Sequence, residues 1–201
     1  RQRRVFIPVT AMPKLVRQAF LSAEDKNFFL HPGIDPLGVA RAVLTNIKNI
    51  ASGKRLVGAS TITQQGAKNF LLTNDVTIER KIKEAILAFR IERALSKQRI
   101  LELYLNEIFL GQNAYGVTAA AQVYFNKSLT ELAPHEAAML AALPQAPGRY
   151  HPVRQKDRVT ERRNYVLREM WQNGYLDEAT YQAEARLPLK SVQNGDYPDF
   201  R

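Results

Sequence analysis

The 201-residue sequence contains no cysteine and only three histidines, His31, His135 and His151. The lack of cysteine excludes a disulfide framework and a thiolate-bound metal. Three histidines scattered along the chain argue against a histidine-rich metal site. No apolar run approaches the ~20 residues that a transmembrane helix needs. What is present is an ordinary globular balance, with 45% hydrophobic and 24% charged residues, which is enough for one domain or two small lobes with a real core.

Acidic residues are in the minority. The chain has 29 Lys and Arg against 19 Asp and Glu, a formal net charge of +10. Such an excess favours anionic partners, namely nucleic acid, phospholipid head groups or a phosphorylated substrate. Charge alone does not choose among these three.

The chain begins at Arg1 without a methionine. We therefore expect a piece of a longer protein, with any anchor or targeting segment outside it. The tail from Ser191 shows no periodicity. We predict a domain over residues 1–190 and a linker over residues 191–201.

Apolar residues recur at helical spacing along most of the sequence, and no β-hairpin signal interrupts them. We predict a mostly α-helical domain. The expected helices span residues 13–28, 36–50, 61–72, 77–95, 97–110, 114–125, 130–143, 157–173 and 177–186. The expected apolar positions are Leu37, Ala40, Val43, Leu44 and Ile47 in 36–50, and Ile78, Ile82, Ala85, Ile86, Phe89 and Ala94 in 77–95.

Four stretches carry polar groups that chemistry could use. In the first, Glu24 and Asp25 fall in the last turns of a helix and precede Phe28, His31 and Gly33. A carboxylate gains nothing from the helix dipole at that end. The two interpretations that stay open are a solvated helix end and a general base facing a cleft.

The second stretch runs from Gly58 to Asn69 and is polar at almost every position. Thr61 and Gln64 fit a capping box at the start of a helix. The run is either a solvated face or a site whose hydroxyl and amide groups bind sugar and whose ammonium binds phosphate. Its candidate residues are Ser60, Thr61, Gln64, Gln65, Lys68 and Asn69.

The third stretch places Arg80, Lys81 and Glu84 on one helix face, a spacing that is most often a surface salt bridge. The fourth, from Lys97 to Asn106, has the spacing of a packed amphipathic helix. We assign it mainly to the scaffold, with Asn106 able to fix a neighbouring loop.

Taken together in this order and spacing, the four stretches resemble the glycosyltransferase family of peptidoglycan polymerases, glycosyltransferase family 51. This family comprises the transglycosylase domains of class A penicillin-binding proteins and their monofunctional relatives. The resemblance runs from about Pro8 to Pro152 and includes the Ala120–Lys127 stretch. The chain departs from the family pattern at Ala59, where glycine is common, and at Gly66, where a larger apolar residue is usual.

The resemblance implies a lysozyme-like helical fold with a large lobe and a smaller, membrane-proximal lobe. It implies polymerisation of lipid II into glycan strands, with inversion at the anomeric carbon and release of polyprenyl diphosphate. The expected location is the periplasmic face of the inner membrane, with an N-terminal anchor and a C-terminal transpeptidase domain in the full protein. The loop 51–58, with Lys54 and Arg55, would then suit a bilayer interface.

The resemblance also implies a role for each candidate. Glu24 matches the catalytic base, and Glu84 matches the second carboxylate. Lys68, Arg80 and Lys81 match the positions that bind the diphosphate. The subsites would be shaped by Asp25, Phe28, His31, Ser60, Thr61, Gln64, Gln65 and Asn69. No cofactor is required, although a divalent cation such as Mg²⁺ could bridge the diphosphate.

Two other functions compete with this interpretation. A lysozyme-like glycoside hydrolase acting on peptidoglycan would also use two carboxylates across a sugar cleft, but would not need three cations around a leaving group. A helical nucleic-acid-binding module would use the positive charge, but the basic residues are spread along the chain and no known reader motif is present. We therefore expect no nucleic-acid partner.

Overall fold

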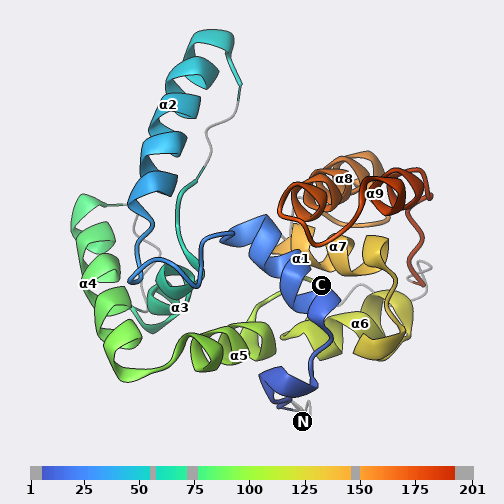
Figure 1. Cartoon of the computed structure of the whole chain (residues 1–201), viewed down its shortest axis with the longest axis horizontal. Helices are drawn as coiled ribbons and strands as arrows, with labels where there is room; N and C mark the ends of the chain where they lie inside the picture. The colour runs from blue at the N-terminus through green and yellow to red at the C-terminus, as the bar shows by residue number, and fades with distance from the viewer. Residues whose placement is uncertain (1–5, 55–57, 72–76, 146–149, 193–201) are drawn as a thin grey trace. The chain divides into compact units, whose positions relative to one another are not determined.

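The computed structural model describes residues 6–54, 58–71, 77–145 and 150–192 (Figure 1). It confirms the mostly helical prediction, since these described residues form no β-strand and only one isolated bridge, between Phe109 and Tyr115. The helices are α1 (Lys14–Glu24), α2 (Pro36–Ser52), α3 (Ile62–Phe70), α4 (Ile78–Ala94), α5 (Lys97–Glu107), α6 (Val117–Phe125), α7 (Pro134–Ala142), α8 (Lys156–Gln172) and α9 (Glu178–Ala185). Short 3-10 turns lie at Val9–Ala11, Leu129–Glu131 and Leu143–Gln145.

The chain divides into two compact units. Unit 1 consists of Arg1–Lys26 and Glu102–Arg201, and unit 2 consists of Asn27–Leu101. This division gives the larger and the smaller lobe that the sequence predicts. The predicted end of the domain at residue 190 lies close to the end of the described chain, and residues 193–201 lie outside it.

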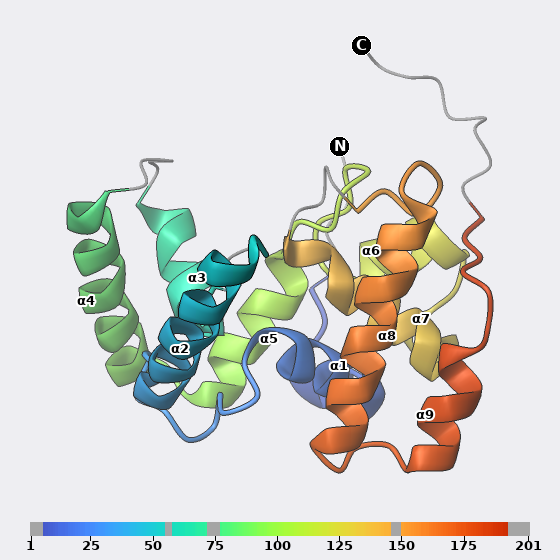
Figure 2. The same ribbon diagram turned by 90° about the horizontal axis from the view of Figure 1, so that it is seen from above.

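Unit 1 is built around α7. This helix packs against α1, α6, α8 and α9 (Figures 1 and 2). Residues 136–142 of α7 are all buried, and four of them are alanines. Small side chains let the neighbouring helices approach closely, so α7 serves as the shared core of the unit.

The N-terminal segment of unit 1 is fixed by α5. Asn106 donates a hydrogen bond from Nδ2 to the carbonyl oxygen of Ile7 and accepts one from its amide, each over 2.8 Å. The Glu102 carboxylate accepts a hydrogen bond from the amide of Val9 over 2.9 Å. The predicted anchoring role of Asn106 is confirmed.

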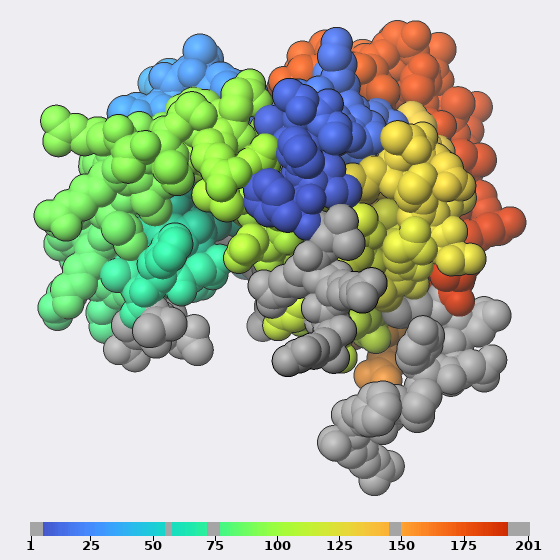
Figure 3. Space-filling model, turned by 90° about the horizontal axis from the view of Figure 1, so that it is seen from below, coloured from blue at the N-terminus to red at the C-terminus, as the bar shows by residue number. Residues whose placement is uncertain are grey.

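Unit 2 contains α3 packed along α4, and Figure 3 shows their atoms side by side. In Figure 1, α2 stands away from both. Most of the large residues on the predicted apolar faces of α2 and α4 do not reach a core. In α2 only Ala42 is buried, and Leu44 and Ile47 are 63% and 60% exposed. In α4 the buried residues are Arg80, Glu84 and Ala88, while Ile78, Ile82 and Ile86 are exposed.

Two predicted boundaries also shift. The first helix ends at Glu24 instead of near Phe28, because Asp25 leaves the helical conformation with φ −164° and ψ 75°. The expected loop 51–58 begins later, since α2 continues through Ser52 and ends at Gly53 in the left-handed conformation. Arg55 lies outside the described residues.

Candidate functional site

The structure places the candidate residues in two groups, one in each unit. Unit 1 holds Glu24 and Asp25. Glu24 is the last residue of α1 and is half-buried, while Asp25 is buried and caps the helix with its amide donating to Leu21 over 2.9 Å. Both carboxylates thus lie at the negative end of the α1 dipole, where cations are the favoured side chains. This is the placement that the sequence predicts for them.

Tyr104 of α5 is a neighbour of these carboxylates that the sequence analysis assigned only to the scaffold. Its ring packs edge-on against Phe20, with centroids 6.4 Å apart. Burial raises the pKa of Tyr104 well above its ordinary value, and the negative charges of Glu24 and Asp25 raise it further. The phenol therefore stays protonated at neutral pH and is a neutral group beside two acids.

In unit 2, residues 27–35 form a tight loop around Phe28 and His31. Phe28 is fully buried and packs edge-on against His31 at 6.0 Å between ring centroids. His31 is 6% exposed, and its Nδ1 accepts a hydrogen bond from the amide of Gly33 over 3.1 Å. A buried ring cannot present a face to substrate, so Phe28 shapes the loop from inside.

The predicted capping box at the start of α3 is confirmed. The amide of Gln64 donates to Thr61 Oγ1 over 3.1 Å, and Gln64 Oε1 accepts from the amide of Thr61 over 3.0 Å. Thr61 Oγ1 also donates to the carbonyl oxygen of Gly33 over 2.7 Å. Thr61 therefore holds the loop against the start of α3, and Gln64 completes the cap. Both are structural uses for residues that were proposed from the sequence as subsite groups.

At the N-terminal end of α4, Arg80, Lys81 and Glu84 form a linked cluster. The carboxylate of Glu84 is 1% exposed and accepts from Arg80 NH1 over 3.3 Å and from Lys81 Nζ over 3.2 Å. Lys81 Nζ also donates to Ser60 Oγ over 3.1 Å. The spacing favoured a salt bridge on the surface. That prediction is wrong for Arg80 and Glu84, since both side chains are buried.

The position of these cations is electrostatically unusual. Arg80 and Lys81 lie in the first turn of α4, after the Thr77 cap. Positive side chains are disfavoured there because the dipole already carries positive charge at that end. The Nε of Arg80 is also buried without a hydrogen-bond partner among the described residues. An arrangement that concentrates positive charge and leaves a donor unused can bind an anion such as a phosphate.

The remaining candidates lie along α3. Lys68 and Asn69 are exposed near its C-terminal end, and Gln65 is half-buried. They share a unit and a packed helix pair with the α4 cluster. The structure thus places the predicted diphosphate-binding residues on two helices of unit 2 that pack against each other.

Sequence reasoning missed Glu92 and underestimated Lys97. The carboxylate of Glu92 accepts hydrogen bonds from Thr63 Oγ1 and Lys97 Nζ, each over 2.7 Å. The contact crosses the break between α4 and α5. Spacing rules for a single helix face therefore gave no signal for it.

No cluster of three acidic or histidine side chains with metal-binding geometry occurs within the described ranges. A hollow of about 460 Å³ lies on unit 2, lined by Pro32, Phe89, Glu92 and Arg93. Phe89 is nine residues beyond Arg80, or ~13 Å along the helix axis. The hollow is therefore separate from the cation cluster.

The Transglycosylase family matches residues 1–171. The chain is 55% identical over 175 residues to penicillin-binding protein 1A of Rickettsia felis and 47% identical over 200 residues to that of Haemophilus influenzae. The two matches cover 87% and 100% of this sequence, respectively. They cover only 22% and 23% of the relatives, so the chain spans less than a quarter of the length of either relative.

A crystal structure of penicillin-binding protein 1A from Haemophilus influenzae matches the fold with a TM-score of 0.56 and 28% identity. The match covers 94% of this chain and 18% of that one. The helical architecture expected from the resemblance is thus confirmed. Because the family matches far more than half of the sequence, the chain belongs to the transglycosylase family.

Proposed function

We propose that this chain is a peptidoglycan glycosyltransferase that polymerises lipid II into glycan strands. The observation that carries the proposal is the buried Arg80–Glu84 pair at the start of α4, with Lys81 and Ser60 attached to it. Transfer from a lipid diphosphate needs fixed positive charge at the leaving group. A glycoside hydrolase releases a sugar hydroxyl and needs none.

The chemistry assigns a separate task to each group. The 4-hydroxyl of the acceptor sugar is a weak nucleophile at neutral pH, and Glu24 takes its proton as the hydroxyl oxygen bonds to the anomeric carbon. The bond from that carbon to the diphosphate oxygen breaks, and the anomeric configuration inverts. The leaving diphosphate gathers negative charge, which Lys68, Arg80 and Lys81 stabilise.

Glu84 has a positioning role in this proposal. It holds the Arg80 guanidinium through one charge-assisted bond and the Lys81 ammonium through another. Arginine can grip phosphate with two parallel bonds, whereas lysine acts as a point charge. Fixing both side chains before substrate arrives lowers the cost of ordering them in the transition state.

The test is incubation of the chain with lipid II in detergent, followed by separation of the products by chain length. Glycan polymer and free polyprenyl diphosphate support transfer. Release of soluble fragments from finished peptidoglycan, without polymer from lipid II, would contradict transfer and support hydrolysis. An Arg80→Met variant should form at least ~100-fold less polymer, as for the loss of one preorganised charge-stabilising group.

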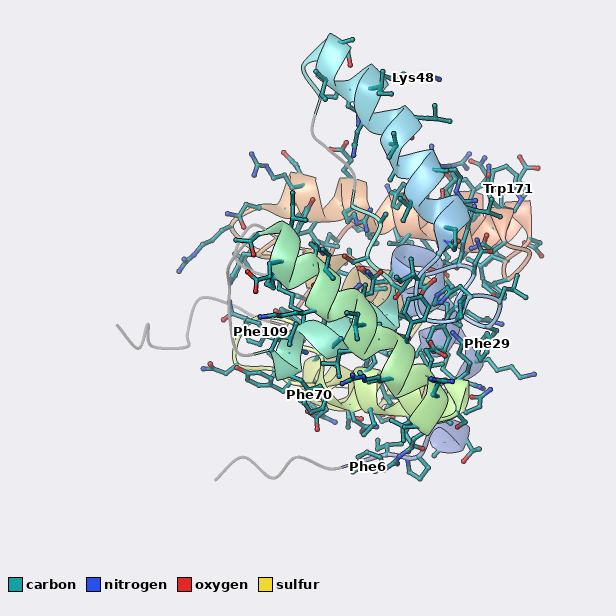
Figure 4. All side chains as sticks on the ribbon, turned by 90° about the vertical axis from the view of Figure 1, so that its left-hand side faces the viewer. Phe6, Phe29, Lys48, Phe70, Phe109 and Trp171 are labelled. Carbon is teal, nitrogen blue, oxygen red and sulfur yellow. The ribbon has the colours of Figure 1, made fainter. Side chains whose placement is uncertain are left out.

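The surface of α2 supports attachment to a membrane. Leu37, Leu44, Ile47 and Ile50 are 60–71% exposed, and Lys48 extends outward near the far end of the helix (Figure 4). Exposed apolar side chains beside basic ones bind the head-group region of anionic bilayers. Within the described residues, no helix has both the length and the hydrophobicity to cross a bilayer.

Vesicle binding tests this attachment. Ile47→Glu should weaken binding to anionic vesicles, because it places a charge on the apolar surface of α2. Thr45→Glu is the matched control, since it adds the same charge to an exposed polar position of the same helix. Equal binding by both variants would contradict a membrane role for α2.

We further propose that the catalytic reaction needs no resident cofactor and that a divalent cation such as Mg²⁺ would arrive with the diphosphate. The proposed location is the periplasmic face of the inner membrane. The proposed partners are the growing glycan strand, an N-terminal anchor and a C-terminal transpeptidase domain in the longer protein, with no nucleic acid.

A further inference from the structure

Three polar side chains from three helices meet inside unit 2. Thr63 of α3 and Lys97 of α5 both donate to the carboxylate of Glu92 on α4, each over 2.7 Å. Thr63 is 1% exposed, and the side chains of Glu92 and Lys97 are 10% and 20% exposed. We call these three residues the Glu92 hub.

The hub also reaches the loop that follows Asn27. The Lys97 ammonium lies 4.5 Å from the centroid of the Phe28 ring and 3.5 Å from His31 Nδ1. Gly33 has φ +117°, and a Cβ built there would lie 3.1 Å from both Ala88 O and Glu92 Cγ. Only glycine fits this approach without strain. The loop is therefore seated directly on α4 beside the hub.

Stability alone does not account for the hub. Removing two charges from water costs free energy, and a buried ion pair is often no more stable than well-packed apolar residues. What a charged hub provides is direction, because one carboxylate oxygen accepts both hydrogen bonds and fixes the donors in space. The hub therefore specifies how α3 and the start of α5 dock on α4.

Ser60 and Thr63 both lie near the N-terminal end of α3, and each is bonded to a different part of α4. Their partners Lys81 and Glu92 are eleven residues apart, or ~17 Å along α4. The two hydrogen bonds therefore fix the start of α3 to two separate points of α4 and set its register there. The relative positions of Lys68 on α3 and of Arg80 and Lys81 on α4 depend on that register.

We propose that Thr63, Glu92 and Lys97 are positioning residues, which hold the cation of α3, Lys68, in register with Arg80 and Lys81 of α4 for the leaving diphosphate. This inference rests on the proposed transfer function. It assigns a task to Glu92 and Lys97 away from the substrate. Small displacements of catalytic groups can cost about 100-fold in rate, so a loose register should appear in turnover.

The decisive variants are Thr63→Val and Thr63→Ser. Valine keeps the shape of threonine but lacks the hydroxyl that donates a hydrogen bond to Glu92. Serine restores this hydroxyl. We expect Thr63→Val to lower kcat for lipid II by about tenfold with KM changed less than threefold, and Thr63→Ser to recover most of the loss. The matched control is Glu79→Gln, which breaks the exposed Glu79–Lys83 pair on the same helix and should leave kcat unchanged.

A second comparison tests whether the residues act as one unit. Glu92→Met combined with Thr63→Val should be no slower than the slower single variant, because each change removes the Thr63–Glu92 hydrogen bond. If the fold losses in kcat of the two single variants multiply in the double variant, the residues act independently and the hub is overturned. An unchanged kcat in Thr63→Val, a lack of rescue by serine, or a fall in melting temperature that accounts for the lost activity would also overturn it.

Binding of inorganic pyrophosphate separates failure of the hub from failure of the proposed function. If the parent makes no polymer, the proposed function fails, and pyrophosphate titration still compares the parent with Thr63→Val. Weaker binding by Thr63→Val supports the hub, and equal binding overturns it. A parent that neither polymerises lipid II nor binds pyrophosphate overturns both proposals.

Discussion

Replacing Glu84 by glutamine should destabilise the protein and stop its chemistry for a single reason. Glu84 is 1% exposed and Arg80 is 7% exposed, so neither side chain can exchange its partner for bulk water. Glutamine keeps the shape of the side chain and removes the negative charge. Arg80 would then be a buried cation without a counter-ion.

The size of the effect follows from burial. Breaking a buried ion pair on one side costs about 3–5 kcal/mol. The Lys81 side chain is 47% exposed, so its share is screened by solvent and adds ~0–1 kcal/mol. The amide oxygen of glutamine can still accept one hydrogen bond and recovers part of the loss. We expect the free energy of unfolding to fall by about 2–4 kcal/mol.

Urea unfolding followed by circular dichroism measures this difference, and Glu79→Gln again serves as the exposed control. The double variant Arg80→Met with Glu84→Met extends the test. Removing both charges together should restore most of the stability, while polymerisation stays absent because the cation is gone. A loss below about 0.5 kcal/mol in Glu84→Gln, within the range of ordinary surface substitutions, would refute the buried-pair argument.

Three further predictions concern stability. Gly66→Ala should raise the free energy of unfolding by about 0.5–1 kcal/mol in urea unfolding, because a Cβ meets nothing within 4 Å and alanine favours a helix interior; a loss of stability would contradict this. Gly116→Ala should instead destabilise the protein in the same assay, because its φ is +86° and a Cβ would lie 2.3 Å from the carbonyl oxygen of Asn106; an unchanged midpoint would count against the strain. Tyr124 donates to Leu110 O, and burial raises the pKa of its phenol. The folded state therefore keeps this proton to a higher pH than the unfolded state does, and the free energy of unfolding should fall above about pH 10. Tyr124→Phe should make that fall shallower, and an unchanged slope would contradict the assignment.

Local signals in the sequence were reliable where one segment decides its own conformation. The capping box of Thr61 and Gln64 appears as predicted, and the helices predicted to begin at residues 36 and 97 begin there as α2 and α5. Each depends on hydrogen bonds or backbone angles within a few residues. Such features need no knowledge of the tertiary fold.

Periodicity did not predict burial where the environment of a helix face depends on which other element packs against it. The stripes of α2 and α4 have the correct spacing, yet most of their large apolar side chains point outward, and α4 buries Arg80 and Glu84 instead. Helical spacing shows which residues share a face, but it cannot show whether that face packs in the protein core or contacts solvent or a membrane. The exposed stripe of α2 is what the proposed membrane contact would use.

The first helix shows a related limit. The helix predicted over residues 13–28 ends at Glu24, and Phe28 is buried in unit 2. The Glu92 hub could not be predicted either, because it joins three helices whose packing the sequence does not reveal. Both misses arise from contacts between segments.

The most direct test of the account is the rate of lipid II polymerisation by the parent and by Glu24→Gln. Glutamine keeps the shape and removes the base, and Glu107→Gln makes the same change at an exposed position of unit 1. The account predicts polymer from the parent and from Glu107→Gln, and at least ~100-fold less from Glu24→Gln, the usual contribution of a general base. A folded Glu24→Gln variant that polymerises lipid II at the parent rate would contradict it.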